Sequence, residues 1–174
     1  MNAQPIGTPV RELDTPALLV DLDALERNLF RMAEHLAGSQ TRLRAHAKTH
    51  KSPILARKQM DLGAVGVCCQ KVGEAEVMVA AGISDILVSS EVTTPLKLRR
   101  LAALTRHARL MVVVDHPRGA QLLAEAMEGG EGEIGVLVDV DVGSGRCGVR
   151  PEDAVALGRR VDGLPGLHLR GLQM

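Results

Sequence analysis

Short apolar runs rich in β-branched residues recur along the chain, and the segments between them carry apolar residues three and four positions apart. The first pattern predicts strands and the second predicts amphipathic helices. Strands are expected at residues 17–20, 43–48, 65–70, 85–89, 110–115, 134–140 and 167–172. Helices are expected at residues 22–37, 53–62, 73–81, 95–108, 117–128 and 151–161. This alternation predicts an α/β fold.

Proline and glycine mark the ends of several of these helices. Prolines stand at the first helical position, where a missing N–H costs nothing; they are Pro53, Pro95, Pro117 and Pro151. Glycines follow helix ends, where a left-handed residue closes the helix cheaply; they are Gly63, Gly82 and Gly129. These local signals support the predicted boundaries.

Continuous apolar strands indicate a parallel sheet that is buried on both faces. Residues 111–114 read Met-Val-Val-Val and residues 136–138 read Val-Leu-Val, without polar alternation. Such strands are typical of parallel sheets covered by helices. The six evenly spaced strands after residue 40 predict an incomplete TIM-type (β/α)8 barrel, because a whole barrel takes about 250 residues and this chain has 174. We expect one partial barrel domain over residues 1–174; an open, doubly wound six-stranded sheet is the alternative.

The charge balance gives no reason to expect a nucleic acid or a membrane as partner. Lys and Arg number 21 and so do Asp and Glu, which leaves a net charge of zero. With one Phe and no Tyr or Trp, the chain lacks the aromatic platforms on which single-stranded nucleic acids stack. No apolar stretch approaches the roughly 20 residues that span a bilayer, and the three cysteines form no spaced disulfide framework. We therefore expect a cytoplasmic protein.

A cationic segment at the end of an expected strand is the richest candidate for chemistry. Residues 44–51 read Arg-Ala-His-Ala-Lys-Thr-His-Lys. Alternation along a strand would put four side chains on one face, those of Arg44, His46, Lys48 and His50. Burying such charges requires an anionic or aromatic partner, which a bound cofactor would supply.

Lys48 is the residue of this face that is best placed to act as an amine nucleophile. Desolvation and neighbouring cations favour a neutral amine, the form that condenses with an aldehyde. A basic strand end that is simply solvated is the alternative. A zinc site at His46 and His50 lacks a further local ligand.

A glycine-rich loop follows the strand expected at 134–140. Its glycines at positions 143, 145 and 148 allow close backbone approach to a ligand, yet the loop matches neither the Walker pattern nor the dinucleotide fingerprint. Arg146 lies among them, and a guanidinium in a tight loop can donate to a heterocycle nitrogen or to a carboxylate. A glycine turn with an exposed arginine is the alternative.

A third candidate, Gln70, lies where an expected strand meets its loop, which is the rim that carries active sites in barrels. Residues 89–91 end the next strand at the same rim with a generic polar signal. We interpret the neighbouring Cys68 and Cys69 as small buried hydrophobic residues, because nothing nearby would activate a thiol.

Taken together, residues 44–51, 63–71 and 139–149 resemble the D-threonine aldolase family, which is grouped with D-serine dehydratases and D-3-hydroxyaspartate aldolases. Residues 13–21 also resemble the entry strand of the wider alanine-racemase-like group. The resemblance covers nearly the whole chain, from about residue 14 onward. It implies the fold of the alanine racemase N-terminal barrel and pyridoxal 5'-phosphate as cofactor.

The resemblance also implies roles for individual residues. Lys48 matches the lysine that binds the cofactor covalently, and Arg146 matches the arginine that faces its pyridine nitrogen. Gln70 resembles a neighbour of the cofactor, and His46, on the expected face of Lys48, is counted with them. An arginine at the pyridine nitrogen leaves that nitrogen unprotonated, because a guanidinium keeps its own proton, so the ring is a mild electron sink.

The activity that the resemblance implies is that of a lyase acting on D-β-hydroxy-α-amino acids, of the type that converts D-threonine to glycine and acetaldehyde. A dehydratase or aldolase for D-serine or D-3-hydroxyaspartate is the alternative within the family. A pyridoxal-phosphate carrier that catalyses no amino-acid reaction and an α/β module that binds no cofactor are the alternatives outside it.

Further expectations concern what lies outside these residues. The family carries a divalent metal in a C-terminal β domain, and we expect its ligands and the phosphate-binding loops beyond residue 174. The 174 residues alone are therefore expected to be inactive or barely active. The expected partner is a small-molecule D-amino acid, and a homodimer is an expectation for the full-length form.

Overall fold

The computed structural model describes residues 5–130 and 132–174, and most of them fold around one parallel sheet. The strands are β1 (Ala45–His46), β2 (Val67–Cys69), β3 (Asp85–Val88), β4 (Arg109–Val114), β5 (Ile134–Asp139) and β6 (Leu167–Gln173). The α-helices are α1 (Leu22–Leu36), α2 (Pro53–Asp61), α3 (Val72–Ala80), α4 (Pro95–Leu104), α5 (Pro117–Met127) and α6 (Ala154–Asp162). The 3-10 helices are η1 (Val10–Glu12) and η2 (Pro151–Asp153).

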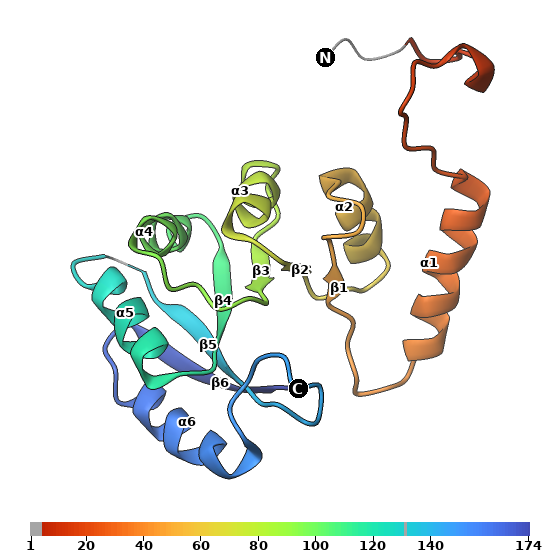
Figure 1. Cartoon of the computed structure of the whole chain (residues 1–174). Helices are drawn as coiled ribbons and strands as arrows, with labels where there is room; N and C mark the ends of the chain where they lie inside the picture. The colour runs from red at the N-terminus through yellow and green to blue at the C-terminus, as the bar shows by residue number, and fades with distance from the viewer. Residues whose placement is uncertain (1–4, 131) are drawn as a thin grey trace.

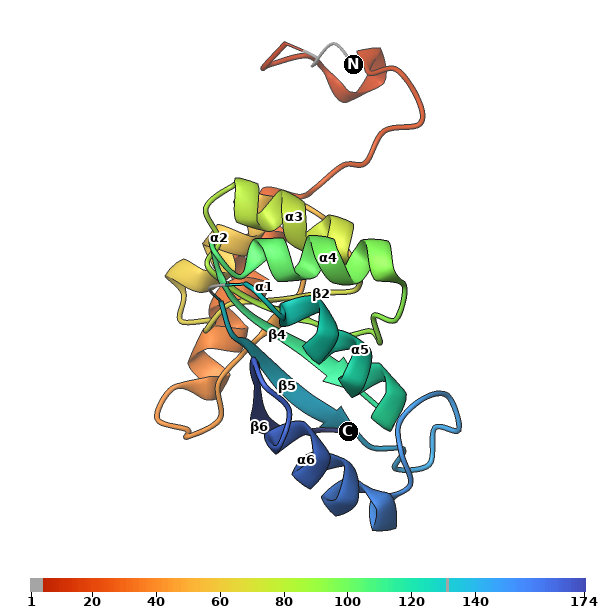
Figure 2. The same ribbon diagram turned by 90° about the vertical axis from the view of Figure 1, so that its left-hand side faces the viewer.

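Each strand pairs in parallel with the next one along the chain, so the sheet order is β1-β2-β3-β4-β5-β6. Figures 1 and 2 show α2 to α6 following one another along the same side of the curved sheet. A doubly wound sheet would reverse its strand order and carry helices on both faces, and the described residues show neither feature. The predicted α/β class and incomplete barrel are confirmed, with six strands in a sheet that does not close.

The main core lies between the sheet and these helices. Alternate strand residues point to this side, and Val67, Ile86, Val112 and Val136 are each 1% exposed or less. The helix side chains packed against them include Ala75, Leu101, Leu123 and Val161. Removing this apolar surface from water, at about 25 cal/mol per Å², is what holds the helices on the sheet.

The opposite, inner face of the sheet carries a much smaller apolar cluster. Cys68, Leu87 and Val113 are its buried members, and Met111 and Leu137 are partly buried beside them. Polar side chains flank this cluster at both ends of the strands. These two ends form the sites described below.

Helix boundaries follow the local signals in the sequence. The expected prolines occupy the first turns of α2, α4 and α5, and the fourth one begins η2 ahead of α6. The glycines that follow α2, α3 and α5 have left-handed φ angles of 99°, 82° and 74°. Helix α4 is shorter than predicted, because the chain turns after Leu104, whose carbonyl accepts the N–H groups of His107 and Ala108.

Two predicted strands are wrong in whole or in part. Residues 17–20 form no strand; they lie in the arm that leads to α1, away from the sheet (Figure 1), and Leu18 is 84% exposed. An apolar run becomes a strand when a neighbouring strand pairs with its backbone, and no described strand does so there. The strand predicted at 43–48 shrinks to β1, because the Lys51 N–H donates to the Ala47 carbonyl at 2.7 Å and closes a turn over residues 47–50.

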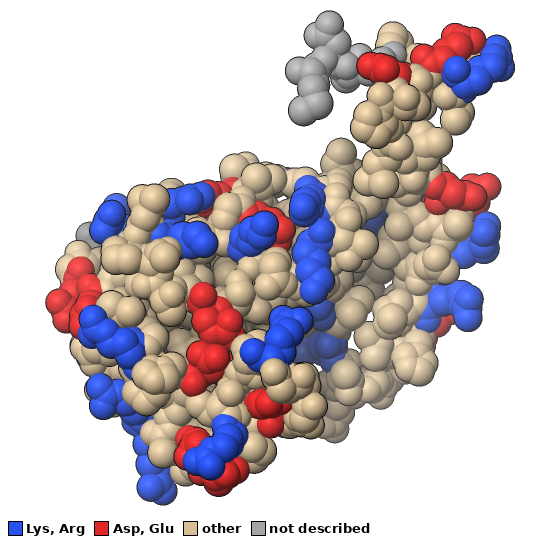
Figure 3. Space-filling model, in the orientation of Figure 1, with Lys and Arg blue, Asp and Glu red and all other residues tan. Residues whose placement is uncertain are grey.

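The surface carries charges of both signs. On the face shown in Figure 3, Lys and Arg side chains are interspersed with Asp and Glu side chains over the body of the molecule. An ion pair of 3.1 Å between Lys58 and Glu26 links α2 to α1. Within the described ranges, no helix is both long enough and apolar enough to cross a membrane.

Candidate functional site

Polar side chains gather on the inner face near the carboxyl ends of β1, β2 and β3. His46 is the last residue of β1, and Ser89 directly follows β3. Their side chains meet, with His46 Nε2 3.3 Å from Ser89 Oγ. The Ser89 hydroxyl also donates to the Cys69 carbonyl at 3.4 Å. This pair therefore connects β1 to β3 across the end of β2.

The hydrogen bonds around His46 determine which ring nitrogen carries a proton. The Lys48 backbone N–H donates to His46 Nδ1 at 3.3 Å, so Nδ1 is an acceptor. Because the Ser89 hydroxyl proton is used on the Cys69 carbonyl, the Nε2–H of His46 is the donor toward Ser89. We therefore assign His46 as a neutral imidazole with its proton on Nε2.

Electrostatics at this edge agree with that assignment. Burial lowers the pKa of His46 from its ordinary value, and the charge of Lys48 lowers it further, while Gln70 and Glu74 act in the opposite direction. Burial raises the pKa of the Cys68 thiol, and the charge of Lys48 opposes part of that rise. Lys48 thus lies within electrostatic reach of two side chains on the inner face.

Lys48 itself lies in the turn after β1, and it is exposed. The alternation that assigned it to the inner face does not apply, because β1 ends at His46. Its position is set instead by its own N–H bond to His46 and by the Ala47 N–H, which donates to the Cys68 carbonyl at 2.7 Å. Ala47 is 1% exposed, so a buried residue anchors the turn that carries the lysine.

Lys51, at the end of the same turn, has an unusual backbone. Its φ is 52°, and it is the one non-glycine residue of the described chain in the left-handed region. That conformation costs an L-residue with a side chain about 1–2 kcal/mol. Strain of this kind is concentrated at functional sites, where the surrounding structure holds it in place.

Gln70 follows β2 and is half-buried. Its backbone N–H donates to the Glu74 carboxylate at 2.7 Å, and its carbonyl accepts the Ser90 hydroxyl. The loop around Gln70 is therefore fixed at both backbone groups. With it, the structure places three of the four predicted site residues, His46, Lys48 and Gln70, at the same end of adjacent strands.

Arg146 lies apart from the other three, in the loop after β5, and it is exposed. Asp141 shapes this loop by accepting the N–H groups of Gly143 at 2.9 Å and Gly145 at 3.0 Å, and these bonds lower the pKa of Asp141. Three strands separate β1 from β5 in the sheet. In the part of the chain that the structure describes, no hydrogen bond or ion pair joins Arg146 to the other predicted site residues.

A cluster that sequence reasoning missed lies between the loops after β3 and β5. Glu91, Asp139 and Cys147 bring their ligand atoms within 4.8 Å of one another. Burial raises the pKa of Glu91, and the charges of Asp115 and Asp139 add to that rise. Asp139 is also the largest cause of the raised pKa of Cys147. Asp139 and Cys147 both belong to the segment 139–149, whereas Glu91 lies in a separate segment, so spacing in the sequence does not bring the three together.

The interpretation of Cys68 and Cys69 as buried hydrophobic residues is confirmed. Cys68 is 8% exposed and Cys69 is fully buried. Burial raises the pKa of Cys69 to about 12, and the charge of Glu74 contributes to the rise. Because the thiolate is the reactive form, Cys69 is not a nucleophile at neutral pH.

A cavity of about 470 Å³ lies beside the carboxyl edge, between the loops that follow β2 and β3 and the helices α3 and α4. Its charged lining consists of Lys51, Lys71, Lys97, Arg100, Glu74 and Glu91. The four predicted site residues do not line it. The cavity is therefore a neighbour of the candidate site.

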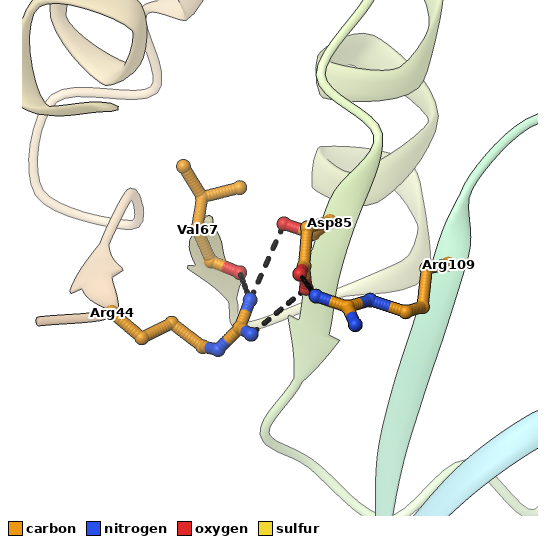
Figure 4. Close-up of polar contacts among 4 residues, drawn as sticks. All are labelled: Arg44, Val67, Asp85 and Arg109. Atoms are coloured by element: carbon orange, nitrogen blue, oxygen red, sulfur yellow. Dashed lines mark hydrogen bonds and ion pairs between the residues drawn. The ribbon is translucent and has the colours of Figure 1, made fainter. Parts of the chain in front are cut away.

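At the amino-terminal end of the strands, Arg44 has a protein partner. Arg44 Nη2 lies 2.8 Å from Asp85 Oδ1, and Arg109 binds the other oxygen of the same carboxylate (Figure 4). Asp85 is 7% exposed. The expectation that a bound cofactor supplies the counter-charge is wrong for Arg44, because Asp85 supplies it.

The side chains at the carboxyl edge fit the cofactor that the resemblance implies. Lys48 offers an exposed amine that takes part in none of the ion pairs of the described residues, and the same is true of the guanidinium of Arg146. An amine suits a carbonyl carbon, and a guanidinium suits a heterocycle nitrogen. A neutral His46 and the amide of Gln70 add uncharged polar groups between β1 and β2.

Comparison with known proteins places this geometry in context. The family described as alanine racemase, N-terminal domain, matches residues 20–174. D-threonine aldolase from Arthrobacter sp is 46% identical over 172 residues, which cover 98% of this chain and 45% of that protein. 3-Hydroxy-D-aspartate aldolase from Paracoccus denitrificans is 41% identical over 170 residues, which cover 96% of this chain and 44% of that protein.

Among solved structures, the crystal structure of D-threonine aldolase from Filomicrobium marinum has a TM-score of 0.91 and 52% sequence identity to this chain. The match covers 94% of this chain and 44% of that one. The chain thus spans less than half the length of the relatives that it matches.

Proposed function

We propose that this chain, which belongs to the alanine racemase N-terminal domain family, is the part of a pyridoxal-phosphate enzyme that attaches the cofactor through Lys48. The observation that supports the proposal is the placement of Lys48. It follows β1 at the carboxyl edge of a barrel-type sheet, its backbone is held by His46, and its amine is exposed. Active sites of such barrels lie at this edge.

Each predicted site residue has a distinct task in this proposal. The Lys48 amine is the nucleophile that binds the cofactor covalently, and its attack needs the unprotonated amine. His46 orients the Lys48 backbone through Nδ1, while Gln70 borders the same space. Arg146 would hold the pyridine nitrogen with its guanidinium, which would leave that nitrogen unprotonated. When bound, pyridoxal phosphate supplies an electron sink that stabilises negative charge on the substrate α-carbon.

For the full-length protein we propose cleavage of D-β-hydroxy-α-amino acids, with D-threonine giving glycine and acetaldehyde. Its similarity to D-threonine aldolases in both sequence and structure supports this choice. The partner is then a small-molecule D-amino acid. The divalent metal with ligands beyond residue 174, the partial-barrel domain boundaries, the cytoplasmic location, the homodimer and the low activity of these 174 residues alone remain predictions.

A second candidate is the cleavage of 3-hydroxy-D-aspartate, which the 41% identity to the Paracoccus enzyme favours. The two substrates differ in the group on the β-carbon, a methyl against a carboxylate. Their aldehyde products differ accordingly, and dehydration would instead release ammonia. Incubating the full-length protein with each substrate and analysing the products separates the three reactions.

The decisive experiment addresses Lys48 directly. We would titrate the full-length protein with pyridoxal phosphate, follow the visible absorbance, reduce with borohydride and map the modified peptide by mass spectrometry. The expected result is one modified residue, Lys48, with no specific labelling of Lys48→Ala.

Lys51→Ala is the matched control, because Lys51 lies in the same turn and is also exposed. It should label Lys48 as the wild type does. Label that is spread evenly over the exposed lysines, or that persists in Lys48→Ala, would contradict the proposal.

A further inference from the structure

The Arg44 side chain reaches across the sheet from the strand that precedes Lys48. Arg44 lies just before β1, yet its Nη1 donates to the carbonyls of Val67 at 3.5 Å and Asp85 at 3.3 Å, in β2 and β3 (Figure 4). Its Nη2 pairs with the Asp85 carboxylate at 2.8 Å. One guanidinium thus fastens the start of β1 to the next two strands.

A glycine makes this path possible. A Cβ built on Gly66, just before β2, would lie 2.5 Å from Arg44 Nη1 and 2.9 Å from Asp85 Cβ, and it would also strike the Asp85 carbonyl. Any side chain at this position would occupy the space through which the guanidinium passes. The φ of Gly66 is 154°, a further reason why another residue is disfavoured. We call Arg44, Gly66 and Asp85 the amino-terminal clamp.

The second arginine on Asp85 differs from Arg44 in burial and in connection. The Arg44 side chain is 17% exposed, whereas the Arg109 side chain is 70% exposed. Arg109 belongs to β4 and pairs with Asp85, and none of the hydrogen bonds or ion pairs of the described residues joins its side chain to β1. Both arginines neutralise the Asp85 carboxylate, but only Arg44 also ties β1 to its neighbours. Comparing variants of the two arginines therefore separates the loss of a counter-charge from the loss of the link to β1.

The fastening has a consequence for Lys48 because β1 is a short strand whose start is tied to β3 by Arg44. The strand is two residues long, and β2 is its one partner among the described strands. Its carboxyl end is held by the contacts of His46 and Ala47, and its start by Arg44. Lys48 follows it after one buried residue, Ala47, and takes its backbone direction from His46. A shift of β1 along β2 would therefore move the lysine, and small misplacements of a reacting group are costly.

We propose that the amino-terminal clamp is a positioning element for Lys48, which it holds at the opposite end of β1 in the place where the amine meets the cofactor. This inference rests on the proposed function. The clamp touches neither cofactor nor substrate. The clamp acts by fixing the register of β1 against β2. Gly66 belongs to the clamp because its missing side chain leaves room for the Arg44 guanidinium.

The test compares Arg44→Met with Arg109→Met, which remove the same charge from the same carboxylate. Both variants are titrated with pyridoxal phosphate, and the fraction of Lys48 trapped by borohydride is measured. Arg44→Met is expected to need about tenfold more cofactor for half-labelling, by loss of orientation, whereas Arg109→Met stays within about twofold of the wild type.

Two further variants guard against a simple loss of folding. Arg44→Lys keeps a cation beside Asp85 but not the planar fork that reaches the carbonyls, so we expect partial rescue of labelling. Arg44→Met combined with Asp85→Leu replaces the buried pair by apolar side chains, which restores stability and should leave labelling weak. Circular dichroism and thermal unfolding report the fold of each variant.

The outcomes are distinct. If the wild type does not label at Lys48, the proposed function fails. If the wild type labels and the Arg44 variants label as well as Arg109→Met, only the positioning role fails. If every Arg44 variant is unfolded, the clamp holds the whole sheet rather than Lys48, and the inference is overturned as well.

Discussion

The two ends of β3 carry carboxylates in opposite circumstances. Asp85, the first residue of β3, is bound by two arginines. Glu91, in the loop after the same strand, has one buried oxygen, Oε1, with no hydrogen-bond partner among the described residues. The pKa of Glu91 is raised by burial and then by neighbouring carboxylates. Asp85 Oδ1 also lacks a well-aligned hydrogen bond, but arginines pair with its carboxylate. One strand thus joins a carboxylate paired with cations to a carboxylate whose pKa is raised by neighbouring carboxylates.

The difference shows how the sheet divides its tasks. At the amino-terminal end, Arg44 and Arg109 pair with the carboxylate of Asp85, and the proposed task of the Arg44 pair is to hold β1. At the carboxyl end, the left-handed backbone of Lys51 and the raised pKa of Glu91 are features that stability alone would not favour. Barrel proteins are expected to hold their function at that end.

The largest effect on stability is expected at the paired end. Asp85→Ala leaves the largely buried Arg44 without its counter-charge, so the free energy of unfolding should fall by about 3–5 kcal/mol. Denaturant unfolding followed by circular dichroism measures the loss. Glu76→Ala is the control, because its pair with Arg100 is more exposed and its loss should cost less than about 1 kcal/mol. Equal losses in the two variants would show that the Asp85 pairs stabilise the fold no more than an exposed ion pair does.

Relief of strain should stabilise the carboxyl end. Lys51→Gly places the residue that tolerates left-handed backbone at a φ of 52°, and the free energy of unfolding should rise by up to about 1 kcal/mol. Lys97→Gly, inside α4, serves as the opposite control and should lower it by about 1 kcal/mol. If Lys51→Gly is destabilising, the turn after β1 is not strained.

Removing the Glu91 charge should have the opposite sign to removing Asp85. The raised pKa of Glu91 means that the folded protein binds its proton more tightly than the unfolded chain. Stability therefore falls as pH rises from the ordinary value of 4.5 through the higher folded value. Glu91→Gln lacks this loss, so at neutral pH it should be more stable by about 0.5 kcal/mol after screening by solvent.

The measurement for Glu91 is a pair of denaturant titrations. The gain from Glu91→Gln should disappear once the pH lies below 4.5, where the wild-type side chain is protonated in both states. Glu125→Gln, which removes an exposed ion pair with Arg118, should show no such gain. A destabilised Glu91→Gln at neutral pH would show that the carboxylate is satisfied after all.

The smallest effect concerns His46. Burial lowers its pKa, so the unfolded chain takes up the proton first as the pH drops below 6.5. Stability therefore falls with pH through the window between 6.5 and the lower folded value. His46→Gln should make this fall shallower between about pH 7.5 and 5.5, and His50→Gln, whose pKa burial also lowers, should act in the same direction. An unchanged slope in His46→Gln would contradict the assignment of His46 as a neutral imidazole.

Elements set by local chemistry were predictable from the sequence. The prolines that begin helices and the glycines that end them act through their own backbone angles, so α2 and α5 fall within one residue of their predicted bounds. A strand, by contrast, forms only where the backbone of a neighbouring strand pairs with it. Residues 17–20 have the pattern of a strand, but no described strand lies beside them. The strand predicted at 43–48 ends early because the chain turns at Ala47.

The candidate site was predictable only residue by residue. Lys48, Gln70 and Arg146 were predicted from residue type, place and resemblance, and their roles stay predictions. The support of Lys48 by His46 Nδ1 depends on a turn that alternation did not foresee. The partner of Arg44 was missed because it lies on another strand. An aspartate directly ahead of the apolar run at 86–88 was the available signal.

The burial of β2 also gives this protein a built-in chemical reporter. Cys68 and Cys69 lie inside the sheet, while Cys147 lies half-buried in the loop that carries Arg146. A thiol reagent should therefore modify Cys147 in the native protein and reach the adjacent pair only when β2 separates from its neighbours. The chain has no tryptophan or tyrosine, so intrinsic fluorescence cannot report the rate at which the sheet opens. The rates of labelling at Cys68 and Cys69 would measure it instead.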